Sequence, residues 1–130
     1  MNGNVLFDTN VITKMLDNDT QAKNLFKQAR FCFTSIIVVG ELYYAAVNSG
    51  KPKENFELFR NFLSHMKIIP LNDAIAFAFA ELKLSLKKIG KPIPENDIWI
   101  AASAKTYSLS IATFDKHFTE ISDIDIVTVS

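Results

Sequence analysis

Short apolar runs alternate with longer amphipathic stretches along the chain. The runs lie at residues 5–7, 31–34, 68–69, 110–113 and 126–129, and we predict a β-strand at each. Between them, apolar residues recur every three or four positions, as on one face of a helix. Strands that alternate with helices form a mainly parallel sheet with helices on both faces. The pattern therefore predicts an α/β fold.

The predicted helices follow the strands in turn. The first helix begins at Thr9 or Asn10, and the last follows Asp97. Between them we predict four helices, over residues 19–29, 36–48, a segment that includes 56–66, and 73–89. The start of the helix at residue 36 is ambiguous, because the run Ile36-Ile37-Val38-Val39 also fits a strand. In a parallel sheet of this kind, the functional crevice lies at the carboxyl ends of the strands.

The segment from residue 92 to 104 is the clearest candidate for chemistry. Pro92 and Pro94 precede an apolar, alanine-rich helix, and we predict Asn96 as its N-cap. Asp97 then lies at the helix start, where the helix dipole favours an anion. Its helical neighbours Ile100 and Ala101 cannot pair with a carboxylate, so Asp97 needs a cation from elsewhere in the fold.

Three further acids stand at comparable positions: Asp8 and Glu41 have no basic neighbour along their own elements, and Asp115 has Lys116 and His117 beside it. Asp8 directly follows the first strand, Asp115 follows the fourth, and Glu41 lies on an apolar helix whose surroundings predict burial. Each has a structural alternative, since Asp8 could cap a helix, Asp115 could form a turn, and Glu41 could accept backbone hydrogen bonds. Four such acids at one edge of a sheet together favour a divalent-cation site. Oxygen ligands suit Mg²⁺ or Mn²⁺, and the two histidines, His65 and His117, are not spaced as a ligand pair.

Composition sets the limits of this interpretation. At 130 residues we expect one domain, 1–130, with a packed core, because 48% of the residues are hydrophobic. The formal net charge is zero, which excludes a passive polyelectrolyte binder of nucleic acid. The single cysteine, Cys32, suits a reducing cytoplasm. Neither a signal peptide nor a membrane-spanning run is predicted.

Four segments in order resemble the PIN domain, and most of all the VapC-type toxins of prokaryotic toxin–antitoxin pairs. They are residues 5–10 (Val-Leu-Phe-Asp-Thr-Asn), the Glu41 helix, residues 96–102 (Asn-Asp-Ile-Trp-Ile-Ala-Ala) and residues 113–118 (Thr-Phe-Asp-Lys-His-Phe). The resemblance implies a PIN-like three-layer α/β/α fold and a Mg²⁺- or Mn²⁺-dependent endoribonuclease. It also implies an RNA substrate, a cognate antitoxin and a homodimer.

The resemblance carries over the site residues one by one. The four acids Asp8, Glu41, Asp97 and Asp115 match its acidic positions, and we expect Asp8 and Asp97 as direct metal ligands. Glu41 would bind metal or position water, and Asp115 would complete the site. The resemblance further implies that Asn10 and Thr113 orient the acids.

Two other functions remain open from the sequence. A phosphatase could use Asp8 as a covalent nucleophile, although Asn10 stands where such enzymes place a second acid. A non-catalytic PIN-like module could bind RNA or protein. The segment 36–46 is apolar nearly all round, which predicts a second buried surface and hence self-association and a tight protein partner.

Overall fold

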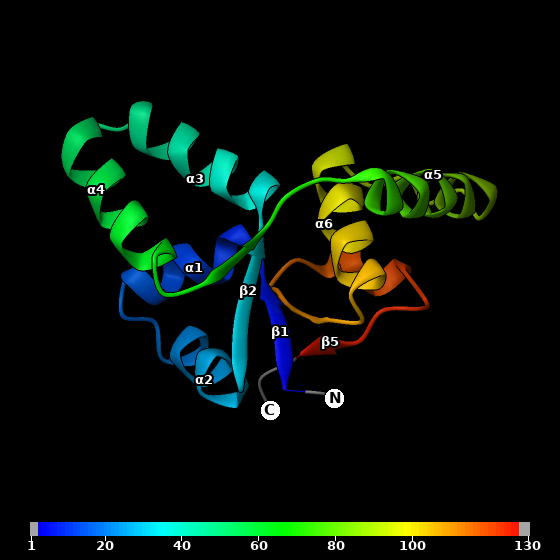
Figure 1. Cartoon of the computed structure of the whole chain (residues 1–130), viewed down its shortest axis with the longest axis horizontal. Helices are drawn as coiled ribbons and strands as arrows, with labels where there is room; N and C mark the ends of the chain where they lie inside the picture. Colours follow the sequence, from blue (N-terminus) through cyan, green and yellow to red (C-terminus); the bar gives the residue numbers. More distant parts are fainter. Residues whose placement is uncertain (1–2, 128–130) are drawn as a thin grey trace.

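A parallel β-sheet runs through the centre of the molecule (Figure 1). The computed structural model describes residues 3–127, and within them the sheet has five strands in the order β3-β2-β1-β4-β5, each parallel to its neighbours. The strands are β1 (Asn4–Phe7), β2 (Phe31–Ser35), β3 (Lys67–Ile69), β4 (Ser110–Ala112) and β5 (Ile126–Val127). Every predicted strand is thus confirmed in place, although residues 128 and 129 of the last prediction lie outside the described residues.

Helices cover both faces of this sheet. They are α1 (Thr9–Leu16), α2 (Thr20–Gln28), α3 (Ile36–Val47), α4 (Pro52–Leu63), α5 (Asp73–Lys88), α6 (Glu95–Thr106) and the short 3₁₀ helix η1 (Lys116–Glu120). In Figure 1, α1, α2 and α4 lie on one side of the sheet and α6 lies on the other, with α5 packed on α6. The predicted three-layer α/β/α fold is confirmed.

The central strand β1 lies in the hydrophobic core of the molecule. Val5, Leu6 and Phe7 have no exposed surface, and Leu6 pairs in register with Phe33 of β2 and Ile111 of β4. A strand buried on both faces reads as a continuous apolar run, which explains why β1 was visible in the sequence. The polar residue that follows it, Asp8, therefore emerges from the most buried part of the sheet.

Local details of four helices differ from the predictions or resolve them. Helix α3 begins at Ile36 with Ser35 as its cap, because the Ser35 hydroxyl accepts a hydrogen bond from the Ile37 amide at 3.0 Å. The ambiguous run is thus helical. Helix α2 begins at Thr20, capped by Asp19, and Gly90 follows α5 with a φ of 69°. The expected cap of α6 was wrong: Pro94 occupies the N-cap, and Asn96 is inside the first turn.

The helix predicted over residues 73–89 is α5, which ends one residue earlier, at Lys88. Ile75, Leu82 and Leu86 are buried on it, whereas Ile89, its C-cap, is 57% exposed. The Phe79 ring stacks on Trp99 with 3.9 Å between ring centroids, which joins α5 to α6. No helix within residues 3–127 is long and apolar enough to cross a membrane.

Candidate metal centre

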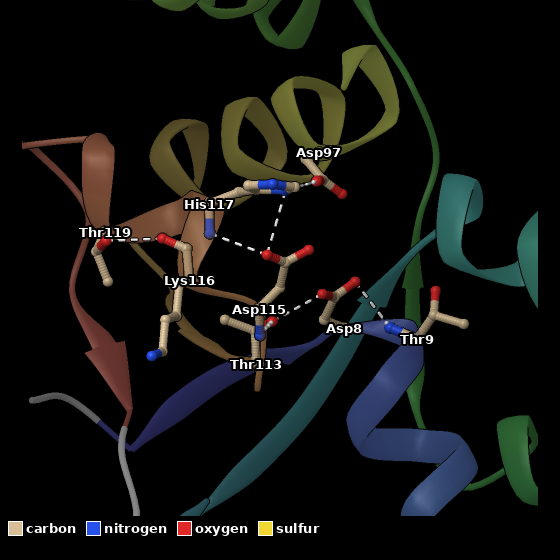
Figure 2. Close-up of polar contacts among 8 residues, drawn as sticks. All are labelled: Asp8, Thr9, Asp97, Thr113, Asp115, Lys116, His117 and Thr119. Atoms are coloured by element: carbon tan, nitrogen blue, oxygen red, sulfur yellow. Dashed lines mark hydrogen bonds and ion pairs between the residues drawn. The ribbon is translucent and has the colours of Figure 1, made fainter. Parts of the chain in front are cut away.

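The end of β1 places Asp8 between two other elements. Its amide donates to the Ala112 carbonyl of β4 at 3.0 Å, so the backbone of Asp8 continues the sheet. Asp8 is also the N-cap of α1: its Oδ1 accepts the Thr9 amide at 2.8 Å, and its Oδ2 accepts the Thr113 hydroxyl at 2.8 Å. Both carboxylate oxygens are held, so the group has one orientation (Figure 2).

The environment of Asp8 disfavours its charge. The residue is only 5% exposed, and burial raises the pKa of its carboxyl from 3.8 to about 6. The two hydrogen bonds, from Thr113 and Thr9, lower the pKa, while the nearby carboxylates of Asp97 and Glu41 raise it. A carboxylate in such a site is strongly stabilised by a nearby cation.

Glu41 reaches the site from α3. Its Oε1 accepts the Thr9 hydroxyl at 2.7 Å, so Thr9 links Glu41 to Asp8 through one residue. This contact agrees with the prediction that no basic residue reaches Glu41 along its own helix. The predicted burial of Glu41 was wrong, because the residue is only partly buried. The partner is a hydroxyl from a neighbouring helix, which the sequence did not reveal.

Asp97 and Asp115 converge on one histidine. The Nδ1 atom of His117 lies 3.3 Å from Asp97 Oδ2 and 3.2 Å from Asp115 Oδ1 (Figure 2). Asp97 comes from the first turn of α6, as predicted, and Asp115 is the N-cap of η1, where its Oδ1 accepts the His117 amide at 2.9 Å. The three side chains therefore meet from two elements.

Burial also affects Asp97. Its side chain is 14% exposed, and desolvation raises the pKa of the carboxyl above its usual range. The hydrogen bond with His117 lowers that pKa, and the charges of Asp115 and Glu41 raise it. Repulsion between the acids thus adds to desolvation at both Asp8 and Asp97.

The two polar residues expected to orient the acids lie in the site but act differently. The Thr113 hydroxyl donates to Asp8 and accepts the Asp115 amide at 2.9 Å, so it connects two acids. The side chain of Asn10 holds the backbone instead, since its Oδ1 accepts the Phe114 amide at 3.2 Å. Asn10 therefore holds the backbone between Thr113 and Asp115 rather than a carboxylate.

The donor set fits a divalent cation. One ligand atom each from Asp97, Asp115 and His117 lie within 4.8 Å of one another. Asp8 and Glu41 lie close enough to add negative charge to the same region. Carboxylate oxygens are the ligands that Mg²⁺ and Mn²⁺ prefer. The site therefore matches the chemistry of these ions.

A surface hollow opens beside the acids. It has a volume of about 540 Å³ and is lined by Ile36, Ile37, Gly40, Glu41, Tyr44 and Asn96. Glu41 thus lies between the carboxylate cluster and this hollow.

Sequence reasoning found the four acids but missed His117 and Thr9. His117 was set aside because it forms no ligand pair with His65, and its actual partners lie on another helix. Its place two residues after Asp115, in the last of the four segments, is the one signal that could have indicated it. Thr9 is 32 residues from Glu41, and no local pattern predicts that contact.

The fold and the site define a parallel α/β protein with a carboxylate centre at the carboxyl edge of its sheet. The family model described as "PIN domain" matches residues 5–124. The chain belongs to the PIN-domain family.

Similar proteins agree with this assignment. A ribonuclease VapC2 from Haemophilus influenzae is 34% identical over 111 residues, which cover 83% of each chain. Two solved structures share the fold. VapBC2 from Rickettsia felis, bound to a promoter DNA fragment, has a TM-score of 0.88 at 24% identity and covers 97% of this chain and 98% of its own. A toxin–antitoxin complex from Klebsiella pneumoniae has a TM-score of 0.77 at 24% identity and covers 92% and 94%.

Proposed function

We propose that the chain is a Mg²⁺- or Mn²⁺-dependent endoribonuclease of the VapC type, the toxin of a toxin–antitoxin pair. Family membership and the VapC ribonuclease relative support the reaction class. The observation that carries the metal requirement is the convergence of Asp97 and Asp115 within 3.3 Å of one histidine nitrogen, beside the buried Asp8.

Each acid has a distinct part in this proposal. Asp8 and Asp97 would bind the cation, because their carboxylates are desolvated and a nearby positive charge would stabilise the ionised form. Asp115 completes the ligand set. Glu41, which lines the hollow, binds metal or positions the attacking water.

When bound by these acids, a cation would supply positive charge beside the scissile phosphate and would lower the pKa of a bound water. The chain's own residues hold that arrangement in place. Thr113 orients Asp8, Thr9 orients Glu41, and Asn10 holds the loop that carries Asp115. No side-chain nucleophile is needed, so the phosphatase alternative, with Asp8 as nucleophile, gains no support from the family or from the relatives.

The exposed side of α3 supports the proposed homodimer. Ile36, Gly40, Tyr44 and Val47 follow one another at helical spacing, and the three apolar side chains are 42%, 67% and 62% exposed. A Cβ added at Gly40 would meet nothing within 4 Å, so packing within the chain does not require this glycine. Glycine inside a helix is destabilising by about 1 kcal/mol relative to alanine, which fits a position where another surface approaches closely.

We also propose a cognate antitoxin as the second partner, since the structural neighbours include a toxin–antitoxin complex and VapBC assemblies. We further propose a cytoplasmic location, where an RNA substrate would be available.

RNA cleavage tests the proposed function. Purified protein is incubated with structured RNAs in Mg²⁺ or Mn²⁺, in EDTA, and as the Asp97→Asn variant. We expect cleavage that requires the metal and falls at least about a hundredfold in the variant, as when a group that stabilises the transition state is lost. Asp73→Asn removes an exposed carboxylate from the first turn of α5, outside the site, and is the matched control that should cleave normally. Equal cleavage in EDTA, or by Asp97→Asn, would contradict the proposal.

A further inference from the structure

We propose that His117 is a nitrogen ligand of the metal and that it makes the site prefer Mn²⁺ over Mg²⁺. This inference rests on the proposed function, because it assigns a fifth residue to the same centre. His117 is not among the four acids that the PIN-domain resemblance carries over, and its geometry alone indicates this role.

The carboxylates of Asp97 and Asp115 converge on one nitrogen of His117. An imidazole nitrogen carries at most one hydrogen, yet Nδ1 of His117 faces oxygens of both Asp97 and Asp115, at 3.3 and 3.2 Å. One hydrogen satisfies one of these oxygens well. A cation at the centre of the three atoms would satisfy all of them.

The spacing of these atoms fits metal coordination. With metal–ligand bonds of about 2.1 Å, adjacent corners of an octahedron lie about 3.0 Å apart. The two nitrogen–oxygen separations are within a few tenths of an ångström of that value, and the three ligand atoms are all within 4.8 Å of one another.

The backbone around His117 holds the ring in position. Asp115 caps η1 by accepting the His117 amide, and the next residue, Phe118, is fully buried. The His117 side chain itself is 52% exposed, so positions opposite the protein ligands remain open to water or substrate. A well-anchored backbone with an open ring is the arrangement that a metal ligand at a catalytic centre requires.

A nitrogen ligand changes which ion is preferred. Mg²⁺ is a hard ion that takes oxygen ligands and keeps several waters. Imidazole favours first-row transition ions, so a site of carboxylates and one imidazole binds Mn²⁺ better than an all-oxygen site would. We therefore expect a lower Kd for Mn²⁺ than for Mg²⁺ in the wild-type protein, and His117→Gln should narrow that difference.

The test uses Mn²⁺ alone and does not depend on activity. Electron spin-echo envelope modulation detects a nitrogen nucleus bonded to Mn²⁺. At about pH 8, where a free imidazole is neutral, we expect a ¹⁴N modulation in the wild type that changes when histidine is labelled with ¹⁵N. His117→Gln should lose the modulation and raise the Kd for Mn²⁺ by about tenfold or more, with little change for Mg²⁺.

Two controls separate the possible failures. His65→Gln removes the other histidine, which lies between α4 and the edge strand β3 and contacts the Asn61 carbonyl; it should keep the full signal. If Mn²⁺ binds and Asp97→Asn weakens it, but the wild type shows no histidine nitrogen, His117 only orders the acids and this inference is wrong. If Mn²⁺ does not bind to the wild type at all, the proposed metal-dependent function fails with it.

Discussion

The buried carboxyl of Asp8 makes stability depend on pH. Its pKa rises from 3.8 to about 6 on folding, so between these pH values the folded chain binds a proton that the unfolded chain has released. Stability therefore falls as the pH rises through this window, and ionised Asp8 is a destabilising group at neutral pH. A difference of about two pKa units corresponds to at most about 3 kcal/mol.

Asp8→Asn should reveal this effect. In metal-free buffer at pH 7 the variant should have a free energy of unfolding about 1–3 kcal/mol above that of wild type, because asparagine is neutral and still caps α1. The advantage should disappear near pH 4, where wild-type Asp8 is protonated in the folded state. Urea unfolding of both proteins at several pH values measures this difference in the free energy of unfolding. A difference that stays constant from pH 7 to pH 4 would mean that Asp8 is not the titrating group.

The Thr113 hydroxyl is a second single-residue test. It donates to Asp8 and accepts the Asp115 amide, and the residue is only 7% exposed. Thr113→Val keeps the shape but leaves both groups without this partner, so we expect a loss of about 1–3 kcal/mol in the free energy of unfolding. Thr113→Ser keeps the hydroxyl and is the control. Equal stability of the two variants in denaturant titrations would contradict the assigned role.

At the scale of elements, the two helices that carry Glu41 and Asp97 begin differently. Ser35 is fully buried and caps α3 through the Ile37 amide, whereas Asn96 is exposed inside the first turn of α6. Ser35→Ala should cost about 1 kcal/mol of unfolding free energy, and Asn96→Ala should stay within about 0.5 kcal/mol of wild type. Chemical denaturation of the matched pair measures both. A loss at Asn96 as large as that at Ser35 would contradict the helix start described here.

Periodicity predicted most of these elements but not their ends. The strand at β1 and the face of α5 were readable, because burial on both sides of a strand and on one side of a helix leaves regular apolar spacing. The N-cap of α6 could not be predicted from periodicity, because Pro94 and Asn96 are both compatible with a helix start and the backbone conformation decides between them. The predicted end of α5 was one residue too late, because Ile89 is the C-cap rather than part of the helix.

The site was predictable only as far as strand ends could be located. Asp8 and Asp115 follow strands, and Asp97 begins a helix, so their place at one edge followed from the topology. The contacts between Thr9 and Glu41 and between His117 and Asp97 join residues 32 and 20 positions apart. Such pairs depend on how helices pack, which a single sequence does not specify.

At the scale of the whole molecule, the exposed stripe on α3 predicts self-association. We expect the wild type to sediment as a dimer, because Ile36, Tyr44 and Val47 form an apolar surface that packing within the chain leaves uncovered. Tyr44→Lys should shift the protein towards the monomer. Leu58→Lys, at an exposed apolar position on α4, is the control and should leave the dimer intact. A wild-type protein that stays monomeric at high concentration would contradict the proposed homodimer.

The clustered carboxylates also link metal binding to the stability of the whole fold. Desolvation and mutual repulsion raise the pKa of both Asp8 and Asp97, so the metal-free protein is destabilised at neutral pH. A cation that binds the folded state relieves this repulsion and adds stability that grows with the logarithm of its concentration. Removing one carboxylate should therefore reduce both effects.

The melting temperature of wild type and Asp97→Asn, measured with and without Mn²⁺ at neutral pH, tests the cation site most directly. Without metal, we expect the variant to melt at or above the wild type. Added Mn²⁺ should raise the melting temperature of the wild type and of the control Asn96→Ala, and should have a much smaller effect on Asp97→Asn. Equal Mn²⁺-induced shifts in wild type and Asp97→Asn would show that Asp97 is not a metal ligand and would contradict the proposed metal site.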